Sequence, residues 1–249
     1  IRTVHFNDLS MSDPFIIPDP ETKTYYLTST GGRLYKSKDL VWWEGPYNII
    51  NVENSWLKGM PAAAEIHKIG DYYYYAGTWN DHSDLIQQVP RRYNVPHNQT
   101  ILLRSKNIEG PYEIFTEDRN YDYQPREWDC IDGTLYEEGG KYYCVFCHEH
   151  TQIFDGTICF VELSEDLTHA VTEPVELFAA SSFLKREASE ECHNVTDGPF
   201  MYRKADGKLL MIWSSGYDSY LQCVAASDNG SIFGEWSHLP TLFDDDGGH

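Results

Sequence analysis

Apolar and polar residues alternate along this chain in short runs, which recur as pairs separated by tight turns. The clearest pair lies in residues 195–215, where an apolar run at Gly198–Tyr202 meets a turn at Asp206-Gly207 and a second run at Leu209–Trp213 returns. Two such runs joined by a Gly-containing turn are typical of a β-hairpin. The sequence therefore predicts a hairpin here, with Asp197 directly before its first strand.

Three further segments repeat this layout. IDGTLYEEGGKYYCVFC opens on Asp132 and turns at Gly139-Gly140, and SDPFIIPDPETKTYYLTS opens on Asp13 with a longer turn. AAAEIHKIGDYYYYAGTW, residues 62–79, has the hairpin but an alanine where the aspartate is expected. We therefore expect a repeated hairpin in which three of the copies place a carboxylate at the same position.

The spacing of these hairpins predicts the fold. They open near residues 13, 62, 132 and 197, and each is followed by further short strands; SKDLVWWEGPY and SKNIEGPYEIF are the same module in two repeats. Four short strands per repeat at this period are typical of a β-propeller. The terminal DDDGGH resembles the opening of a fifth repeat near residue 246. We expect residues 1–249 to form a single all-β domain, a five-bladed β-propeller with four blades covered and the fifth only begun. A β-sandwich is the alternative, but it does not explain the internal repeat.

Two polar segments interrupt the repeats. Residues 80–100 are expected to be an insertion after the second hairpin, and residues 181–192 a loop with one helical turn at most. Because loops at the mouth of a propeller shape its site, these segments are expected to decide between exo and endo action.

Composition narrows the class of ligand. The net charge of −20 argues against nucleic acid and anionic membranes, both of which require a basic surface. Aromatic residues make up 14% of the chain, which suits β-structure and the stacking of sugar rings. The six cysteines are too few for a disulfide scaffold, and we interpret them as buried thiols. No apolar run approaches the roughly 20 residues that span a bilayer. We expect a monomer, secreted or periplasmic with its leader absent from this chain; a cytoplasmic location is left open.

The three aspartates suggest a chemistry. In a propeller the first strand of each blade lines the central channel, so Asp13, Asp132 and Asp197 are expected to converge there. Carboxyl groups gathered in a small space resist joint ionisation, and a carboxyl pair with separated pKa values is what glycoside hydrolysis uses. The alternative is that each aspartate only caps a turn, since Asp-Gly and Asp-Pro are common turn dipeptides.

SDPFIIPDPETKTYYL, IDGTLYEEGGKYYCVF, VTDGPFMYRKADGKLLMIWSS and the terminal DGGH resemble glycoside hydrolase family 43 along nearly the whole chain. The resemblance implies a five-bladed propeller that removes arabinofuranosyl or xylosyl units from plant polysaccharides with inversion. It implies Asp13 as general base, Asp132 as the aspartate that orients the acid and modulates its pKa, and Asp197 as general acid.

One departure from the family concerns the acid. The family has glutamate where this chain has Asp197, so the carboxyl is one methylene shorter, and a misplacement of about 1 Å costs roughly 100-fold in rate. Either the pocket is adapted to aspartate, or activity is weak, or another residue is the acid. Glu190, Glu191 and His193 lie just upstream as alternatives, although a solvated polar loop explains them equally well.

Secondary site residues follow from position and resemblance. Phe15 and Trp79 are candidates for stacking on sugar, and His148 ends a strand near the expected mouth; plain core packing is the alternative for both aromatic residues. His249 resembles the family's channel histidine, which approaches a bound calcium ion or its waters; disorder or an expression tag also explains it. No cofactor is required, and a structural calcium ion is left open.

Three rival functions remain. A retaining, fructan-cleaving hydrolase needs a carboxyl pair about 5–5.5 Å apart, whereas an inverting enzyme needs about 6.5–9.5 Å. A phosphorylase needs a basic phosphate site, and no Lys/Arg cluster lies near the repeat openings. A catalytically silent, carbohydrate-binding propeller is favoured by the departure at Asp197.

Overall fold

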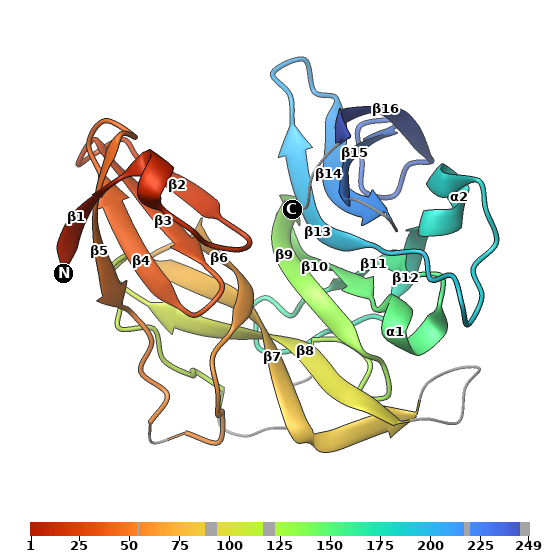
Figure 1. Ribbon diagram of the computed structural model, residues 1–249, viewed down its shortest axis with the longest axis horizontal. Helices are drawn as coiled ribbons and strands as arrows, with labels where there is room; N and C mark the ends of the chain where they lie inside the picture. Colours follow the sequence, from red (N-terminus) through yellow and green to blue (C-terminus); the bar gives the residue numbers. More distant parts are fainter. Residues whose placement is uncertain (54, 88–93, 117–122, 217–219, 245–249) are drawn as a thin grey trace. The chain divides into compact units, whose positions relative to one another are not determined.

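The computed structural model describes residues 1–53, 55–87, 94–116, 123–216 and 220–244. Within them the chain consists mainly of β-strands, which form four sheets in sequence order (Figure 1). The two α-helices of this described part, α1 (His150–Ile153) and α2 (Ala180–Leu184), have four and five residues, too few to cross a membrane. The predicted all-β class is confirmed, and α2 is the helical turn expected in residues 181–192.

The first sheet has five strands in the order β1-β5-β4-β3-β2. Its strands are β1 (Arg2–His5), β2 (Phe15–Asp19), β3 (Thr24–Ser29), β4 (Arg33–Ser37) and β5 (Trp42–Asn48). Strands β2 to β5 form the predicted meander. Strand β1 pairs antiparallel with the last strand, β5, and precedes a 3-10 turn at Phe6–Asp8. The sequence pattern does not predict β1, because four residues are too few to establish a period.

The second sheet corrects one expectation. It has the order β6-β7-β8, with β6 at Ala62–Ile69, β7 at Tyr72–Gln87 and β8 at Asn94–Ser105. Most of the expected insertion at residues 80–100 is therefore strand. Within it, Asn80 Nδ2 donates to Asn98 Oδ1 at 2.7 Å. Because polar side chains can pair across strands as apolar ones do, a polar stretch need not be a loop.

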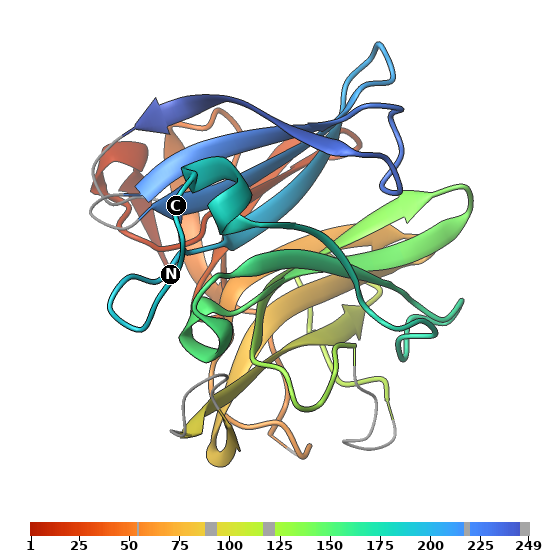
Figure 2. The same cartoon turned by 90° about the vertical axis from the view of Figure 1, so that its right-hand side faces the viewer.

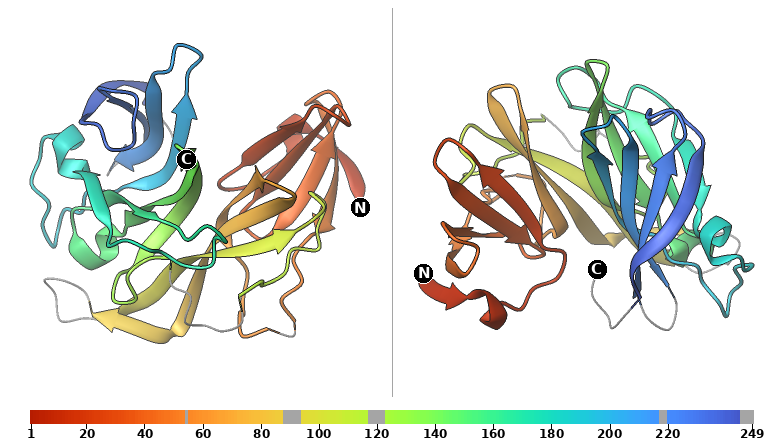
Figure 3. Two further views of the ribbon diagram at one scale, coloured as in Figure 1. Left: turned by 180° about the vertical axis from the view of Figure 1, so that it is seen from behind. Right: turned by 90° about the horizontal axis from the view of Figure 1, so that it is seen from above.

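The third and fourth sheets each have four strands. The third consists of β9 (Cys130–Glu138), β10 (Lys141–His148), β11 (Thr157–Glu162) and β12 (Val175–Ala179). The fourth consists of β13 (Asp197–Arg203), β14 (Leu209–Gly216), β15 (Tyr220–Ser227) and β16 (Trp236–Asp244), shown in blue in Figure 2. In both, neighbours in sequence pair antiparallel, and the hairpins predicted in these two segments are confirmed (Figure 3).

All four sheets share a turn, which follows β4, β8, β11 and β15. A serine at or just beyond the strand end is followed two residues later by aspartate or asparagine, and the two side chains hold the turn through hydrogen bonds. The pairs are Ser37 with Asp39, Ser105 with Asn107, Ser164 with Asp166, and Ser227 with Asn229. Asx side chains that accept backbone N–H groups two or three residues on are a known way to close such turns. The module seen in two repeats thus has a structural counterpart in all four.

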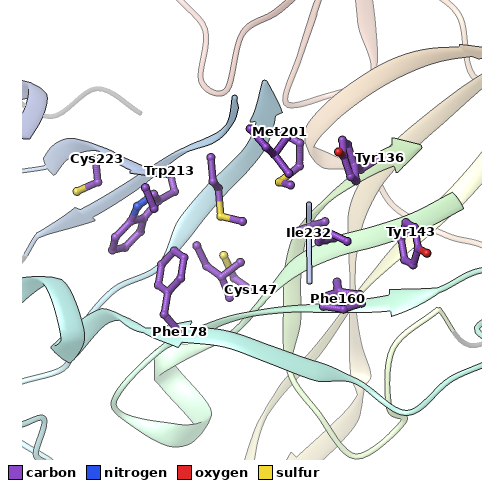
Figure 4. Close-up of a cluster of buried hydrophobic side chains, with 14 of the residues drawn as sticks. Tyr136, Tyr143, Cys147, Phe160, Phe178, Met201, Trp213, Cys223 and Ile232 are labelled. Atoms are coloured by element: carbon purple, nitrogen blue, oxygen red, sulfur yellow. The ribbon is translucent and has the colours of Figure 1, made fainter. Parts of the chain in front are cut away.

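The chain divides into two compact units, each with its own core. Unit 1 comprises residues 1–79 and 101–119, and unit 2 comprises residues 80–100 and 120–249. The core of unit 1 includes Leu34, Tyr75 and Tyr112. The core of unit 2 is formed by the inward faces of the third and fourth sheets, around Trp213 and Phe160 (Figure 4). The site residues lie at the strand ends that these cores hold in place.

Candidate functional site

Every sheet opens on the same backbone irregularity. Three residues of the first strand stand opposite two of its neighbour: Ile131 pairs with Cys147 and Thr134 with Val145 in the third sheet. The fourth sheet shows the same step between the pairs of Asp197 and Phe200, and the second sheet between those of Ala62 and Glu65. In the first sheet, Ser12 accepts from Thr30 N before Phe15 pairs with Thr28. A bulge of this kind re-aims the side chains at a strand end.

The second residue of each bulge has a left-handed backbone. Its φ is 53° at Asp13, 45° at Ala63, 56° at Asp132 and 52° at Gly198. Residues other than glycine, asparagine and aspartate adopt this region at a cost, which suits Asp13, Asp132 and Gly198 and leaves Ala63 as the strained position of the four.

This register corrects the expectation that the three aspartates are equivalent. Asp13 and Asp132 occupy the left-handed second position, whereas Asp197 occupies the first, since Gly198 takes the second. The Asp-Gly dipeptides that open the third and fourth sheets, Asp132-Gly133 and Asp197-Gly198, are thus offset by one residue. The carboxyl of Asp197 therefore leaves the bulge from a different backbone position than the carboxyls of Asp13 and Asp132.

In unit 1, Asp13 is half-buried and held by a hydroxyl. Thr30 Oγ1 donates to Asp13 Oδ2 at 2.5 Å, and the backbone N–H of Ala63 donates to Thr30 Oγ1 at 3.0 Å. The opening of the first sheet is thereby fixed to that of the second. Phe15, two residues on, is half-buried with its ring centroid 5.6 Å from that of His67.

In unit 2, Asp132 and Asp197 are brought together. Asp132 Oδ2 accepts the backbone N–H of Gly198 at 3.0 Å, so one carboxylate holds the bulge that carries the other. Asp197 is 7% exposed, and its Oδ2 accepts the hydroxyl of Tyr220 at 2.8 Å. Burial and then the charge of Asp197 raise the pKa of Tyr220 above its usual range.

A further carboxyl, Glu149, belongs to this site. It caps the N-terminus of α1, where its Oε1 accepts the N–H of His150 at 2.9 Å, and it is 8% exposed. Burial, followed by the charges of Asp197 and Asp129, raises the pKa of Glu149 to about 8. At neutral pH this carboxyl therefore keeps its proton.

The hydrogen bonds around Glu149 fit a protonated carboxyl. Thr151 Oγ1 lies 3.0 Å from Glu149 Oε2 and 3.0 Å from Asp129 Oδ2. A hydroxyl has one hydrogen to donate, so two ionised carboxylates cannot both be satisfied by it. Asp129 also accepts the backbone and side-chain N–H groups of Asn98, at 3.0 and 2.7 Å, which suit an ionised carboxylate. Burial raises the pKa of Asp129 as well, but only Glu149 has its pKa raised to about 8, so we assign the shared proton to Glu149.

The histidines of the segment differ in their surroundings. The ring of His148 stacks on Trp128 at 4.0 Å and its Nε2 contacts Gln152 Oε1 at 2.8 Å, and burial lowers its pKa to about 4. His150 Nδ1 lies 3.1 Å from His193 Nδ1, and burial lowers the pKa of His150 to about 4 as well. His148 is thus a neutral, buried ring, and its role in substrate binding stays a prediction.

The alternative acids separate into two groups. Glu190 and Glu191 are exposed at the tip of a turn that Ser189 and Cys192 close with two backbone hydrogen bonds, as a solvated loop would have them. His193 is half-buried beside His150.

Two predicted residues lie elsewhere. Trp79 is 4% exposed within the core of unit 1, which is the arrangement that core packing alone would give. His249 lies outside the described residues, so its metal role stays a prediction. In the described part of the chain, no three His, Cys, Asp or Glu side chains gather as metal ligands do.

Sequence reasoning missed Glu149 and Tyr220. Glu149 lies between the two histidines of CHEHT, and its signal is the combination of a carboxyl with the end of a strongly apolar strand. No sequence pattern marks Tyr220, because it comes close to Asp197 only when β15 pairs with β14.

Comparison with known proteins identifies the family of this chain. The model of the family "Glycosyl hydrolases family 43" matches residues 7–243. The chain belongs to this family. It is a glycoside hydrolase, and the resemblance of its repeat openings is confirmed. A comparison with curated protein sequences finds no match.

Solved structures of glycoside hydrolases are similar to this chain. An endo-arabinase from Bacteroides thetaiotaomicron VPI-5482 is similar with a TM-score of 0.82 and 32% identity, over 99% of this chain and 86% of that one. An endo-1,4-beta-xylanase from the same organism has a TM-score of 0.69 at 20% identity, over 96% and 76%. An alpha-L-arabinofuranosidase from Lactobacillus brevis has 0.70 at 16%, over 95% and 74%. The four sheets of this chain are therefore four blades of an all-β propeller.

Proposed function

We propose that this protein is an inverting glycoside hydrolase of arabinose- or xylose-containing polysaccharides, with Asp13 as general base and Asp197 as general acid. The observation that carries the assignment is the hydrogen bond from Gly198 N to Asp132, which couples the carboxyl at the opening of blade three to the bulge that bears Asp197. Arabinan is the first substrate to test, because the endo-arabinase shares 32% identity over 99% of this chain.

The proposed reaction is a single displacement. Asp13 takes a proton from a water molecule as its oxygen attacks the anomeric carbon. The glycosidic C–O bond breaks, and the leaving oxygen takes the proton of Asp197. Inversion requires the two carboxyl groups to stand about 6.5–9.5 Å apart so that the water fits between base and sugar.

The surrounding residues have supporting roles in this proposal. Thr30 fixes the orientation of Asp13 through its hydroxyl. Asp132 orients the acid through Gly198, and Tyr220 holds Asp197 Oδ2. Neutral Glu149 adds no second negative charge when Asp197 has given up its proton.

We further propose that the protein has a fifth blade. Asp246 and the following Gly-Gly recur at the spacing of the first two repeats, which supports a fifth blade. A secreted or periplasmic, monomeric protein with a carbohydrate partner fits this function.

The test is hydrolysis of linear arabinan, an aryl α-L-arabinofuranoside and an aryl β-D-xyloside by the parent and by Asp13→Asn. We expect turnover of at least one substrate and a loss of about 10³-fold in the variant, since an essential general base contributes roughly 10²–10⁴-fold. Asp19→Asn is the matched control, because Asp19 ends β2, the strand that follows Asp13, and caps an exposed turn with Thr22. Unchanged turnover in Asp13→Asn would remove Asp13 as the base. Binding of arabinan with no turnover by the parent would identify a carbohydrate-binding propeller instead.

A further inference from the structure

A cavity of about 510 Å³ lies in unit 1, on the first blade. Four of its lining residues form one row across four strands: Tyr26 pairs with Lys36, Lys36 with Glu44, and Glu44 with Thr3. Residues in register across a sheet project from the same face. The floor of the cavity is therefore a continuous strip of sheet, and none of these residues has a role in the proposed reaction.

An exposed tryptophan forms part of the wall. Trp42 and Trp43 are neighbours in β5, so their side chains point to opposite faces. Trp43 is fully buried, whereas Trp42 is 53% exposed and lines the cavity. Exposing an indole to water is unfavourable by its apolar area. A tryptophan at a solvent-facing strand position thus suggests that something else covers it.

The indole is held in place before any ligand arrives. The His5 ring packs against it with centroids 5.0 Å apart and an interplanar angle of 79°. Asp39 Oδ1 accepts the backbone N–H of Trp42 at 2.9 Å and fixes the strand end. An aromatic ring with few rotatable bonds, already oriented, loses little entropy when a ligand stacks on it.

The polar walls are also ordered and carry both signs of charge. Lys36 Nζ pairs with Glu109 Oε2 at 3.0 Å, and Lys38 Nζ donates to Thr24 Oγ1 at 2.6 Å. The charged lining residues are two lysines against three carboxylates, namely Lys36, Lys38, Asp39, Glu44 and Glu109. A near balance of charge does not select an anion or a cation. Hydroxyl, ammonium and carboxylate groups together suit a neutral ligand with many hydroxyl groups.

We propose that this Trp42 cavity is a second carbohydrate-binding site, which holds a short stretch of the neutral polysaccharide that the enzyme cleaves. Its size falls within the roughly 300–1,000 Å³ of small-molecule sites. The identity of the sugar rests on the proposed function. A second contact on the same polymer raises the local concentration of substrate without a new contact at the catalytic residues.

The experiment compares Trp42→Ala with the parent in two assays. The first is retardation by linear arabinan or xylan in native gels, carried out in the slow Asp197→Asn background. The second is turnover of the aryl glycoside, carried out without that substitution. We expect the dissociation constant for the polymer to rise about tenfold, the equivalent of about 1.4 kcal/mol, with aryl glycoside kcat/KM within about twofold. Tyr202→Ala is the matched control, since Tyr202 is 50% exposed on a strand of unit 2, and it should leave both unchanged.

Two further variants guard against misfolding. Trp42→Phe keeps a ring and should keep most of the polymer binding, whereas Glu44→Ala, on the floor of the cavity, should weaken it severalfold. Polymer binding that is equal in the parent, Trp42→Ala and Glu44→Ala would overturn the proposal. Absence of turnover of arabinan and of both aryl glycosides by the parent would instead count against the proposed reaction, and the binding assay would still test the cavity.

Discussion

Asp13 and Asp197 both lie at the opening of a blade, but their surroundings differ in kind. Asp13 is half-buried and held by the neutral hydroxyl of Thr30. Asp197 is 7% exposed and contacts Tyr220, whose pKa is raised first by burial and then by the charges of Asp197 and Asp132. One carboxyl has a neutral partner, and the other lies among acidic groups.

Two aspartates at similar positions can therefore differ in their tendency to ionise. A carboxyl with hydrogen-bond donors and access to water is suited to ionisation, and one crowded by other carboxyls is suited to keeping a proton. The proposed base and acid follow this division.

Asp197→Asn should separate acid from base by its dependence on the leaving group. We expect arabinan hydrolysis to fall about 10³-fold, but hydrolysis of an activated dinitrophenyl glycoside less than about tenfold, because a good leaving group needs no proton. Asp13→Asn should lose both. The measurement is kcat on the two substrates, with Asp206→Asn in the exposed turn of the same hairpin as control. An equal loss on both substrates would show that Asp197 is not the acid.

Glu149→Gln should change how stability depends on pH. The folded-state pKa of Glu149 is raised from 4.5 to about 8, so its contribution to stability is complete below about pH 4.5 and is lost as the pH rises through about 8. The glutamine variant stays neutral and should gain on the parent over this window, by about 5 kcal/mol at most. Thermal melts of both proteins from pH 4.5 to 9 measure this. The exposed Glu137→Gln serves as control, and parallel curves for parent and Glu149→Gln would refute the protonated Glu149.

Tyr220→Phe removes the hydroxyl that donates to Asp197 Oδ2 at 2.8 Å. Loss of a hydrogen bond to a charged group costs about 1.5–3 kcal/mol, which sets an upper limit of roughly 100-fold; we expect about tenfold in kcat. The alkaline limb of the pH profile should move upwards, because the phenol no longer stabilises the ionised carboxyl. Tyr202→Phe should change neither quantity. A lower kcat with an unmoved limb would mean that Tyr220 acts through packing alone.

Thr30→Val should have the mildest effect, on the base side. It removes the donor to Asp13 Oδ2 and the acceptor of Ala63 N, so we expect kcat to fall about fivefold through poorer orientation of Asp13. Thr30→Ser keeps the hydroxyl and should recover most of the rate. If serine and valine behave alike, the hydroxyl does not position the base.

Features that depend on neighbouring residues could be predicted from the sequence, whereas features that depend on pairing between strands could not. Local patterns sufficed for the hairpins, because alternation and turn residues act over a few positions; the turn at Gly139-Gly140 and the strands around it are one case. The long strands β7 and β8 were not predictable from polarity, since their polar residues pair across strands. The offset of Asp197 by one residue depends on a bulge, and bulges are properties of pairing rather than of one strand.

The candidate site shows the same division. The blade openings pointed to Asp132 and Asp197, which the structure links through Gly198. Glu149 and Tyr220 reach this site from β10, α1 and β15, and no spacing in the sequence relates them to Asp197. Burial and neighbouring charge give these groups their chemistry, and both arise only when the blades have packed.

The serine and Asx turns that follow β4, β8, β11 and β15 also affect how the chain folds. Their hydrogen bonds join residues two to four positions apart, and each sheet pairs strands that are mostly consecutive in the sequence. Contacts so close along the chain close small loops, which form quickly and at low entropic cost. We therefore expect blades to appear early in refolding as separate local units. The buried acidic pair of Asp197 and Glu149, which depends on assembly of the third and fourth blades, should be among the last features to form.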